Sequence, residues 1–504
     1  MLEPQSLMMD LESELFDYTA GRFLYASCIF ANDAHHFRER RRVFNIPGLF
    51  NTIAKAMNCG TEQIVDFRKL AEGGFNRIFL ITLDTEFQLV ARIPYPLLVP
   101  KAYAVASEVA TMDFLRSKGL PIPKAKTENI LMEYVKGTNL SQIWSDLKED
   151  EIISLMDQLA KVESTMMSIS FPAGGSIYYA RDLKELSGNE GIPLDNQAES
   201  IAFEKERFCI GPIEQLKMKS VLFAGAEKEL AYLNQFGAPR NLARYLRLAP
   251  SLVPDDDSLS AFCIRHPDLT DSNLRVSTDS DCLQMLSVLD WQHAAVLPLF
   301  LHAERRVRGV SRKMVKHELP DGHDKLTEKD KDQERVLRRR LVHYHYNLST
   351  ATHNRIHHKG LVHPLNPYRC RIFIHATDMW EGETIKFLYA LIDLVRGWGY
   401  FATDGATCPV VFTEKVIVAA EELWQALANA ERGERWLRDF VAYGEETWVP
   451  AAHYEAAKAI GQEVKRRTFK ACAEDEEMTK ETYAVIEANW PLDDMNEDEL
   501  RGYK

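Results

Sequence analysis

The sequence contains little that would fix it by disulfide bonds or place it in a membrane. Its 8 cysteines are scattered over 504 residues with no CxxC pair, which favours free thiols in a reducing compartment. The longest apolar run, at 294–303, includes Pro298 and is shorter than the ~18 residues that span a bilayer. The N-terminal segment lacks the features of a signal or transit peptide. We therefore expect an intracellular chain without a transmembrane segment.

A surplus of basic residues is also missing. The chain has 61 Lys and Arg against 74 Asp and Glu, for a net charge of -13 and a pI near 5.7. Proteins that bind nucleic acid neutralise its phosphates with an excess of Lys and Arg side chains, so this balance argues against a nucleic-acid partner. The basic runs at 38–42 and 335–340 are then solvated faces. The remaining composition is that of an ordinary globular protein.

Hydrophobic periodicity divides the chain into four regions. Helical spacing over 1–60 predicts a helical N-terminal extension. Strand-like segments dominate 61–138, and helical periodicity prevails over 139–400, with a charged insert near 317–335 that we interpret as a solvated loop. Residues 401–504 predict amphipathic helices and an acidic tail.

The strand-rich region has a definite order of elements. It begins with two hairpin strands around a glycine loop, continues with a third strand and a helix, and ends with a further strand. The predicted strands lie at 65–71, 77–83, 87–93 and 129–135, and the helix at 102–119.

A cluster of polar residues lies in RHPDLTDSNLRV, at 265–276, and a further carboxylate, Asp290, follows the apolar run MLSVL. Phosphoryl transfer needs a base near the attacking hydroxyl and a divalent metal on the phosphates. Asp268 has the residue type for the base, and Asn273 and Asp290 offer the oxygen ligands that Mg²⁺ prefers. The H-x-D-x4-N spacing from His266 is a loop spacing. The competing interpretation is that these residues only form turns.

The order of elements before this cluster favours phosphoryl transfer. Gly73 and Gly74 would let backbone N–H groups approach the phosphates of ATP. Arg92, in the third strand, would contact the α- and β-phosphates and pair with Glu108 of the following helix. Each feature alone is common, and their agreement in order carries the interpretation.

These motifs resemble the aminoglycoside phosphotransferase-type, protein-kinase-like superfamily, specifically a large fungal group that includes a mitochondrial-inheritance protein. The matching segments include KLAEGGFNRIFLITL, VARIPYP, SEVATMDFL, PIPK, HPDLTDSNLRV and LDWQHAAVLPLFLHA. The resemblance implies an α+β, two-lobed protein-kinase-like fold, with a small lobe at 61–138 and a large lobe at 139–400. It also implies transfer of the γ-phosphate of ATP, with Mg²⁺, to a hydroxyl of a small molecule. A mitochondrial location is implied as well, with the cytoplasm as the alternative.

The resemblance also implies roles for single residues. Asp268 matches the catalytic base, and His266 matches the histidine that braces the catalytic loop. Asn273 and Asp290 match the metal ligands. Glu133 and Val135 match the hinge strand that contacts the nucleotide.

Two positions depart from the pattern of the family. Arg92 stands where kinases usually have Lys, and Thr270 stands where protein kinases have Lys and antibiotic kinases often have His. Arginine keeps the charge and changes the geometry of its contacts. The alternative function is therefore a catalytically weak pseudokinase or a nucleotide-binding scaffold associated with mitochondria.

A second possible metal site is weaker. His353 and His357 are spaced i, i+4 and could clamp a metal on a helix. No acidic residue completes an H-E-x-x-H motif, so a polar surface helix is the favoured interpretation. Trp291, directly after Asp290, is expected in the core.

Overall fold

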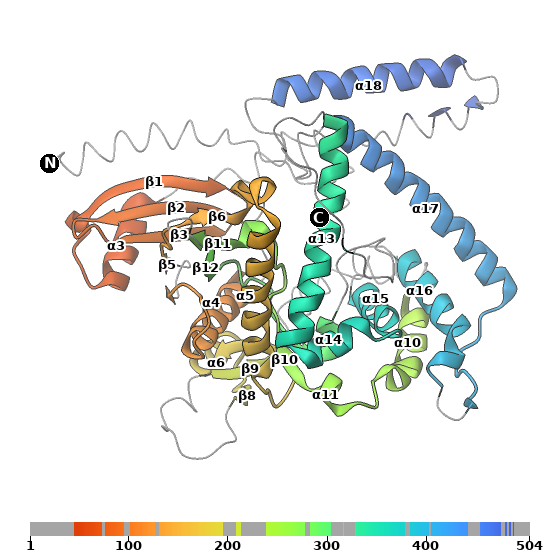
Figure 1. Ribbon diagram of the computed structural model, residues 1–504, viewed down its shortest axis with the longest axis horizontal. Helices are drawn as coiled ribbons and strands as arrows, with labels where there is room; N and C mark the ends of the chain where they lie inside the picture. The colour runs from red at the N-terminus through yellow and green to blue at the C-terminus, as the bar shows by residue number, and fades with distance from the viewer. Residues whose placement is uncertain are drawn as a thin grey trace. The chain divides into compact units, whose positions relative to one another are not determined.

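The protein is described here by a computed structural model (Figure 1). The described residues are 45–72, 76–94, 101–126, 131–194, 208–212, 238–277, 283–303, 316, 328–377, 384–402, 405–441, 454–474, 479–480, 483–484 and 487. Most of the predicted N-terminal extension lies outside them. The chain divides into two compact units, Met1–Leu98 with Glu422–Lys504, and Val99–Glu421. The predicted lobe boundary at 138 stays a prediction.

The first unit contains an antiparallel sheet in which consecutive strands pair. Its strands are β1 (Ile64–Glu72), β2 (Asn76–Leu83) and β3 (Gln88–Pro94), and the helix before them is α3 (Ile46–Met57). Phe50 of α3 meets Phe67 of β1 edge to face at 5.4 Å, and Phe67 stacks on Phe79 of β2 at 4.8 Å. These contacts place α3 on one face of the sheet. The three strands predicted at 65–71, 77–83 and 87–93 are confirmed.

The second unit is mainly helical. Its helices are α4 (Lys101–Ser117), α5 (Glu149–Ser168), α6 (Ala180–Ser187), α10 (Ala238–Leu252), α11 (Asp257–Ser260), α12 (Leu299–His302), α13 (Glu328–His353), α14 (Arg355–Val362), α15 (Asn366–Thr377) and α16 (Thr384–Arg396). The long helix α17 (Glu414–Val441) begins in this unit, and α18 (Tyr454–Glu474) belongs to the first. The helix predicted at 102–119 is confirmed by α4.

Small antiparallel sheets accompany these helices. The strands are β4 (Ala125–Lys126), β5 (Leu131–Glu133), β6 (Thr138–Asn139), β7 (Ser176–Tyr179), β8 (Ile192–Pro193), β9 (Phe208–Gly211), β10 (Phe262–Ile264), β11 (Leu274–Ser277), β12 (Gln284–Val288) and β13 (Val296–Pro298). Pairing joins β4 to β5, β10 to β13, β7 and β8 to β9, and β6 and β12 to β11. Helices with small sheets confirm the predicted α+β class.

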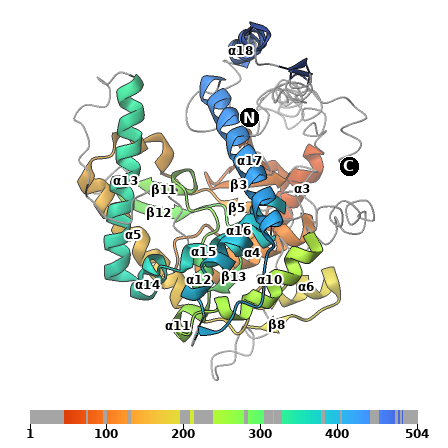
Figure 2. The ribbon, with the colours of Figure 1, turned by 90° about the vertical axis from the view of Figure 1, so that its right-hand side faces the viewer.

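Helices α5 and α13 lie side by side, as Figures 1 and 2 both show. The buried face of α5 carries Ile152, Leu155 and Leu159, a spacing of three and four residues that gives one apolar stripe. The stripe joins a hydrophobic core that also contains Val288 of β12 and Leu341 of α13. The strands around the polar loop and the two helices are thus parts of one core.

The interpretation of 317–335 as a solvated loop is wrong for its last part. Residues 328–335 form the first turns of α13. Glu, Lys, Gln and Arg are good helix formers, and Glu334 is 2% exposed with its carboxylate 2.8 Å from Nε of Arg338. Glu334 is therefore paired with Arg338 inside the helix and is not solvated.

Helices α10, α15 and α16 bury a second core in this unit (Figure 2). Leu248 and Leu391 are fully buried there, and Tyr245 meets Phe387 edge to face at 6.0 Å.

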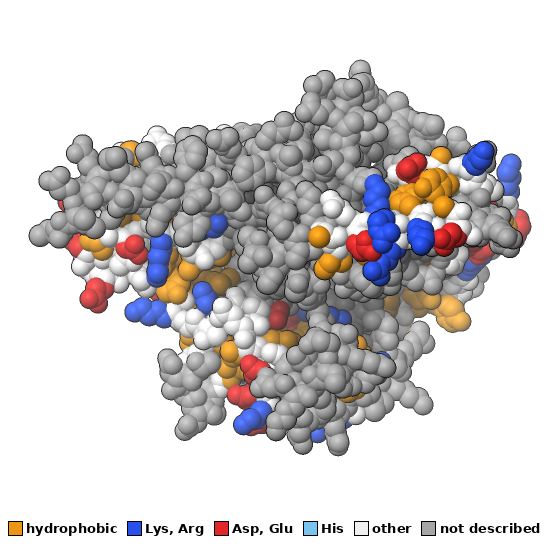
Figure 3. Space-filling model, turned by 90° about the horizontal axis from the view of Figure 1, so that it is seen from above, with side chains coloured by type: hydrophobic (Ala, Val, Ile, Leu, Met, Phe, Trp, Pro, Cys, Tyr) orange, Lys and Arg blue, Asp and Glu red, His pale blue; other side chains and the backbone are white. Residues whose placement is uncertain are grey.

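The described surface mixes charges of both signs. On the face in Figure 3, Lys and Arg side chains are interspersed with Asp and Glu side chains. None of the helices in the described part of the chain has the length and hydrophobicity of a membrane span.

Candidate active site

His266 lies two residues after the end of β10 and is held inside the protein. Its side chain is 1% exposed, and its ring meets that of Trp291 edge to face at 4.7 Å. Nδ1 accepts a hydrogen bond from the backbone N–H of Asp268 at 3.1 Å, and Nε2 lies 2.8 Å from the carbonyl oxygen of Leu289. Because a carbonyl only accepts, the ring is assigned as the tautomer protonated at Nε2.

Asp268 and Asn273 lie together in the loop between β10 and β11. Nδ2 of Asn273 donates to the backbone carbonyl of Asp268 at 2.7 Å and to its Oδ2 at 3.3 Å. The N–H of Thr270 donates to the same carbonyl at 3.0 Å. The turn that the competing interpretation requires is therefore present, and it holds the exposed carboxylate of Asp268 next to an amide.

Asp290 reaches this loop through the residue before it. Strand β12 ends at Val288, and Leu289 then donates its N–H to the carbonyl of Asn273 at 2.8 Å while its own carbonyl accepts from His266. Asp290 is exposed and has a φ of 62°, in the left-handed region. One peptide segment thus brings His266, Asn273 and Asp290 to the same place.

The predicted hinge residues lie on and just after β5. Glu133 donates its N–H to the carbonyl of Lys124 at 2.9 Å. Its carboxylate accepts from the N–H of Lys124 at 3.4 Å and lies 3.5 Å from Nη1 of Arg116, which is in α4. The side chain of Glu133 therefore binds the end of α4, and Val135 is partly buried.

Arg92 and Glu108 are both buried, at 5% and 2% exposure. Arg92 belongs to the first unit, where Asn76 is its neighbour on β2. With the amide oxygen of Asn76 turned toward it, Arg92 donates from Nε at 3.0 Å and from Nη2 at 2.9 Å. The ion pair of Arg92 with Glu108 would join the two units and stays a prediction, and Gly73 and Gly74 lie outside the described residues.

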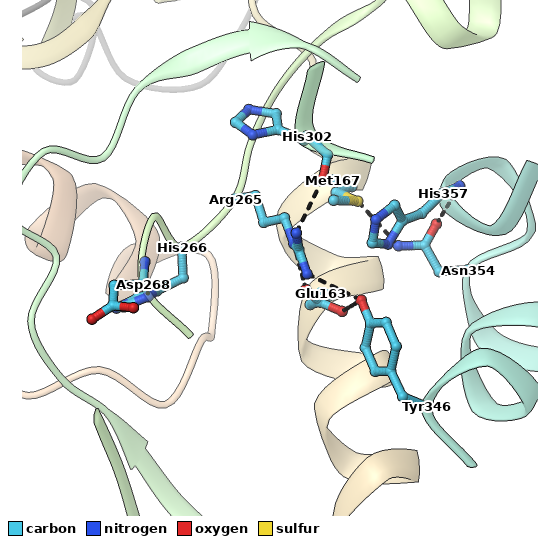
Figure 4. Close-up of polar contacts among 9 residues, drawn as sticks. All are labelled: Glu163, Met167, Arg265, His266, Asp268, His302, Tyr346, Asn354 and His357. Carbon is cyan, nitrogen blue, oxygen red and sulfur yellow. Dashed lines mark hydrogen bonds and ion pairs between the residues drawn. The ribbon is translucent and has the colours of Figure 1, made fainter. Parts of the chain in front are cut away.

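A buried polar network behind the loop was missed by sequence reasoning (Figure 4). Arg265 donates from Nε to Oε1 of Glu163 at 2.6 Å, and the hydroxyl of Tyr346 donates to Oε2 of Glu163 at 2.6 Å. Burial acts to raise the pKa of Glu163, but the charge of Arg265, the influence of His357 and the hydrogen bonds from Tyr346 and Arg265 together outweigh it and hold that pKa below its ordinary value. Burial and the charge of Glu163 raise the pKa of Tyr346. The sequence offered no signal beyond the position of Arg265 next to His266.

The interpretation of the His353 and His357 segment as a polar surface helix is wrong. His357 is fully buried in α14, and neither ring nitrogen has a hydrogen-bond partner. His353 ends α13 and contacts Asp157, while Asn354 caps the start of α14. Burial lowers the pKa of His357 to about 3 and that of His302 to about 4. The described residues contain no cluster of three or more His, Cys, Asp and Glu that could hold a metal.

Matches among solved structures include small-molecule kinases. The streptomycin-ATP-APH(2")-IIa ternary complex matches with a TM-score of 0.36 and 16% identity, over 70% of this chain and 97% of that one. An ethanolamine kinase from Plasmodium vivax matches with a TM-score of 0.37 and 11% identity, over 73% of this chain and 93% of that one. At this level of likeness these structures add no argument of their own.

Similar sequences come from fungi. A subtelomeric hrmA-associated cluster protein of Aspergillus fumigatus is 26% identical over 507 residues, covering 86% of this chain and 98% of the relative. Altered inheritance of mitochondria protein 9, mitochondrial, from Clavispora lusitaniae is 31% identical, covering 45% of this chain and 43% of the relative. No family model matches the chain. The resemblance to fungal mitochondrial-inheritance proteins that the motifs predict is confirmed by these sequence matches.

Proposed function

We propose that this chain is a phosphotransferase that uses ATP and Mg²⁺ to transfer the γ-phosphate to a hydroxyl of a small molecule. The observation that carries the proposal is the double hydrogen bonding of Leu289. Its carbonyl accepts from His266, its N–H donates to Asn273, and Asp290 follows it directly. The exposed carboxylate of Asp268 lies in the same loop. The proximity of these four residues supports the roles proposed below for Asp268, Asn273 and Asp290.

Asp268 is proposed as the general base. Its carboxylate would orient the acceptor hydroxyl and take its proton as the new O–P bond forms. Nδ2 of Asn273 contacts both the carboxylate and the backbone carbonyl of Asp268, so the carboxylate is held in place before the acceptor binds. Such preorganisation is what a loose phosphoryl-transfer transition state needs from a protein.

The donor atoms fit Mg²⁺. Asn273 uses Nδ2 for Asp268, which leaves its amide oxygen as a ligand, and Asp290 supplies a carboxylate. Mg²⁺ is commonly held by one or two protein oxygens, with waters and phosphates completing the shell. The ion would neutralise negative charge on the phosphates.

The nucleotide part of the proposal is supported by the order of elements along the chain. Strands β1 and β2 flank the segment with Gly73 and Gly74, and β3 carries Arg92. In this proposal the glycines admit the phosphates to the backbone, and Arg92 pairs with Glu108. The hinge residues Glu133 and Val135 would contact the adenine ring of the nucleotide.

The second candidate is a pseudokinase or nucleotide-binding scaffold. It is favoured by the environment of Arg92, because Asn76 already takes two of its donors within the sheet. An arginine held in this way reaches a phosphate less freely than a lysine does. For either function we propose a mitochondrial location from the names of the relatives, with the cytoplasm as the alternative.

Slow hydrolysis of ATP to water tests the proposal without the true acceptor. Asp268→Asn keeps the shape of the side chain and removes the charge, so turnover should fall about 10²-fold or more while MgATP affinity is kept. The control is Asp271→Asn, since Asp271 lies in the same loop and its carboxylate caps the N–H of Ser272 at 3.1 Å. Equal turnover in wild type and Asp268→Asn, both above an Asp290→Ala variant, would remove Asp268 as the base. No turnover in wild type would favour the scaffold.

A further inference from the structure

We propose that Arg265 is a positioning residue that fixes the backbone of the loop carrying Asp268. The inference rests on the proposed function, because it takes Asp268 to act on the acceptor. It concerns the network behind the loop, where Arg265 meets Glu163 and Tyr346, and not the residues that would touch substrate.

The guanidinium of Arg265 is bound by acceptors on three separate elements. Nε donates to Glu163 of α5 at 2.6 Å, and Nη1 donates to the carbonyl of His302, the last residue of α12, at 3.0 Å. Nη2 donates to the hydroxyl of Tyr346 of α13 at 3.2 Å. The residue is 8% exposed. Its backbone position is therefore set by three helices.

The neighbouring residue holds the loop from the other side. Figure 4 shows Arg265 directed toward Glu163 and Tyr346, whereas His266 and Asp268 lie on the opposite side of the chain. The ring of His266 is bound to Leu289 and packed against Trp291. The side chains of two consecutive residues, Arg265 and His266, are thus anchored on opposite sides of the backbone. Asp268 begins the turn that follows. A displacement of Arg265 moves this turn, because only two residues separate Arg265 from Asp268.

Stability alone does not account for this choice of residues. A buried ion pair loses much of its Coulomb attraction to desolvation, and apolar residues of similar volume often stabilise a fold as well or better. An apolar side chain would fill the space but would not fix direction. A planar guanidinium with acceptors on three sides fixes both the position and the orientation of the residue.

The chain offers a matched control in Arg338. It is also buried, pairs with Glu334 at 2.8 Å, and donates to the carbonyls of Ser145 at 2.7 Å and Leu147 at 2.8 Å. Its contacts fix the segment before α5 and none of its hydrogen bonds reaches the loop of Asp268. Arg265→Lys and Arg338→Lys therefore each replace a buried guanidinium that is paired with a glutamate, and only the first of them contacts the elements behind the loop of Asp268.

The experiment compares these two lysine variants in full-length protein, well below their melting temperatures. For ATP hydrolysis, Arg265→Lys should lower kcat by about 10²-fold with KM for MgATP unchanged, the scale of a misplaced catalytic group. Arg338→Lys should keep kcat within about 3-fold of wild type, since it leaves the loop in place. Equal values of kcat in the two variants would overturn the proposal.

Amide hydrogen exchange gives a readout that does not need activity. The N–H groups of Asp268, Thr270 and Asn273 are hydrogen-bonded within the loop, so they should exchange faster in Arg265→Lys and at the wild-type rate in Arg338→Lys. If wild type hydrolyses no ATP, the proposed function fails, and this exchange still decides whether Arg265 positions the loop. Unchanged loop exchange in Arg265→Lys would refute the positioning role.

A second variant covers the case in which Arg265→Lys does not fold. Tyr346→Phe keeps the ring and removes the hydroxyl between Arg265 and Glu163, so it should show the same two effects at smaller size, about 10-fold in kcat. Tyr344→Phe, on the same helix, is its control. Loop exchange and kcat that are equal in these two variants would overturn the proposal in the same way.

Discussion

Asp290 combines two properties that substitution can separate, a charge and an unusual backbone conformation. Its φ of 62° lies in the left-handed region, and its side chain is exposed. Asn and Asp enter this region more readily than other residues with a Cβ, and Gly enters it without steric cost. We expect Asp290→Asn to fold like wild type, Asp290→Gly to be tolerated, and Asp290→Ala to be the least stable variant. All of them should lose metal-dependent nucleotide binding.

The size of the stability difference follows from two opposing terms. A Cβ in the left-handed region costs roughly 1–2 kcal/mol. Glycine avoids this cost but gives the unfolded chain more freedom, which lowers stability by roughly 0.4–1 kcal/mol. The difference leaves Asp290→Gly more stable than Asp290→Ala by about 1 kcal/mol, which corresponds to a melting temperature on the order of 2 °C higher.

Thermal melts with and without MgATP measure both properties. In wild type, MgATP at 100 times its Kd should stabilise the protein by about 2.7 kcal/mol, and the part of the shift that requires Mg²⁺ should vanish in all three variants of Asp290. An Asp290→Ala variant more stable than Asp290→Gly would refute the backbone argument. A metal-dependent shift that survives in Asp290→Asn would refute the role of the carboxylate as ligand.

Two further predictions concern Arg92 and the buried histidine. Arg92→Ala and Glu108→Ala should each weaken MgATP binding, and the double variant should lose less than the sum; strict additivity would show that the two side chains do not interact. The pKa of His357 is lowered to about 3 by burial, whereas an unfolded histidine titrates near 6.5. The unfolded chain therefore takes up this proton first, and His357 should make stability fall as the pH drops below about 6.5, by at most about 1.4 kcal/mol per pH unit. His357→Leu should flatten the curve of unfolding free energy against pH between about 6 and 4, and a curve parallel to wild type would contradict the assignment.

The local elements of this chain could be predicted because short-range pattern determines them. Runs of β-branched, aromatic and other apolar residues between turn signals predicted β2 and β3, and most residues of both strands are buried. The apolar run MLSVL gave β12, and hence the place of Asp290 just beyond a buried strand. Residue types in the loop then indicated the site, because oxygen ligands and a base have few substitutes in phosphoryl transfer.

The network around Arg265 could not be predicted, since it depends on contacts between distant parts of the chain. Glu163 lies 102 residues before Arg265, and Tyr346 lies 81 residues after it. No period or spacing links residues on separate helices; only the packing of α5 against α13 brings them together. His357 was misplaced for a related reason. A single polar residue in a short helix carries no signal of burial when groups close to it, such as Glu163 of α5 and His302 of α12, are far away in sequence.

The backbone of Leu289 shows how an apolar residue can organise a polar site. Motif residues attract attention because their side chains carry the chemistry, yet His266 and Asn273 are joined here through a carbonyl and an N–H that any residue could supply. What the position requires is that β12 stop at Val288 and that the chain then turn sharply, as the left-handed Asp290 allows. Trp291, 1% exposed, then packs against the ring of His266. Asp290 thus exposes its carboxylate, while Trp291 buries its ring against His266. The two adjacent residues together fix the position of the carboxylate relative to the loop of His266.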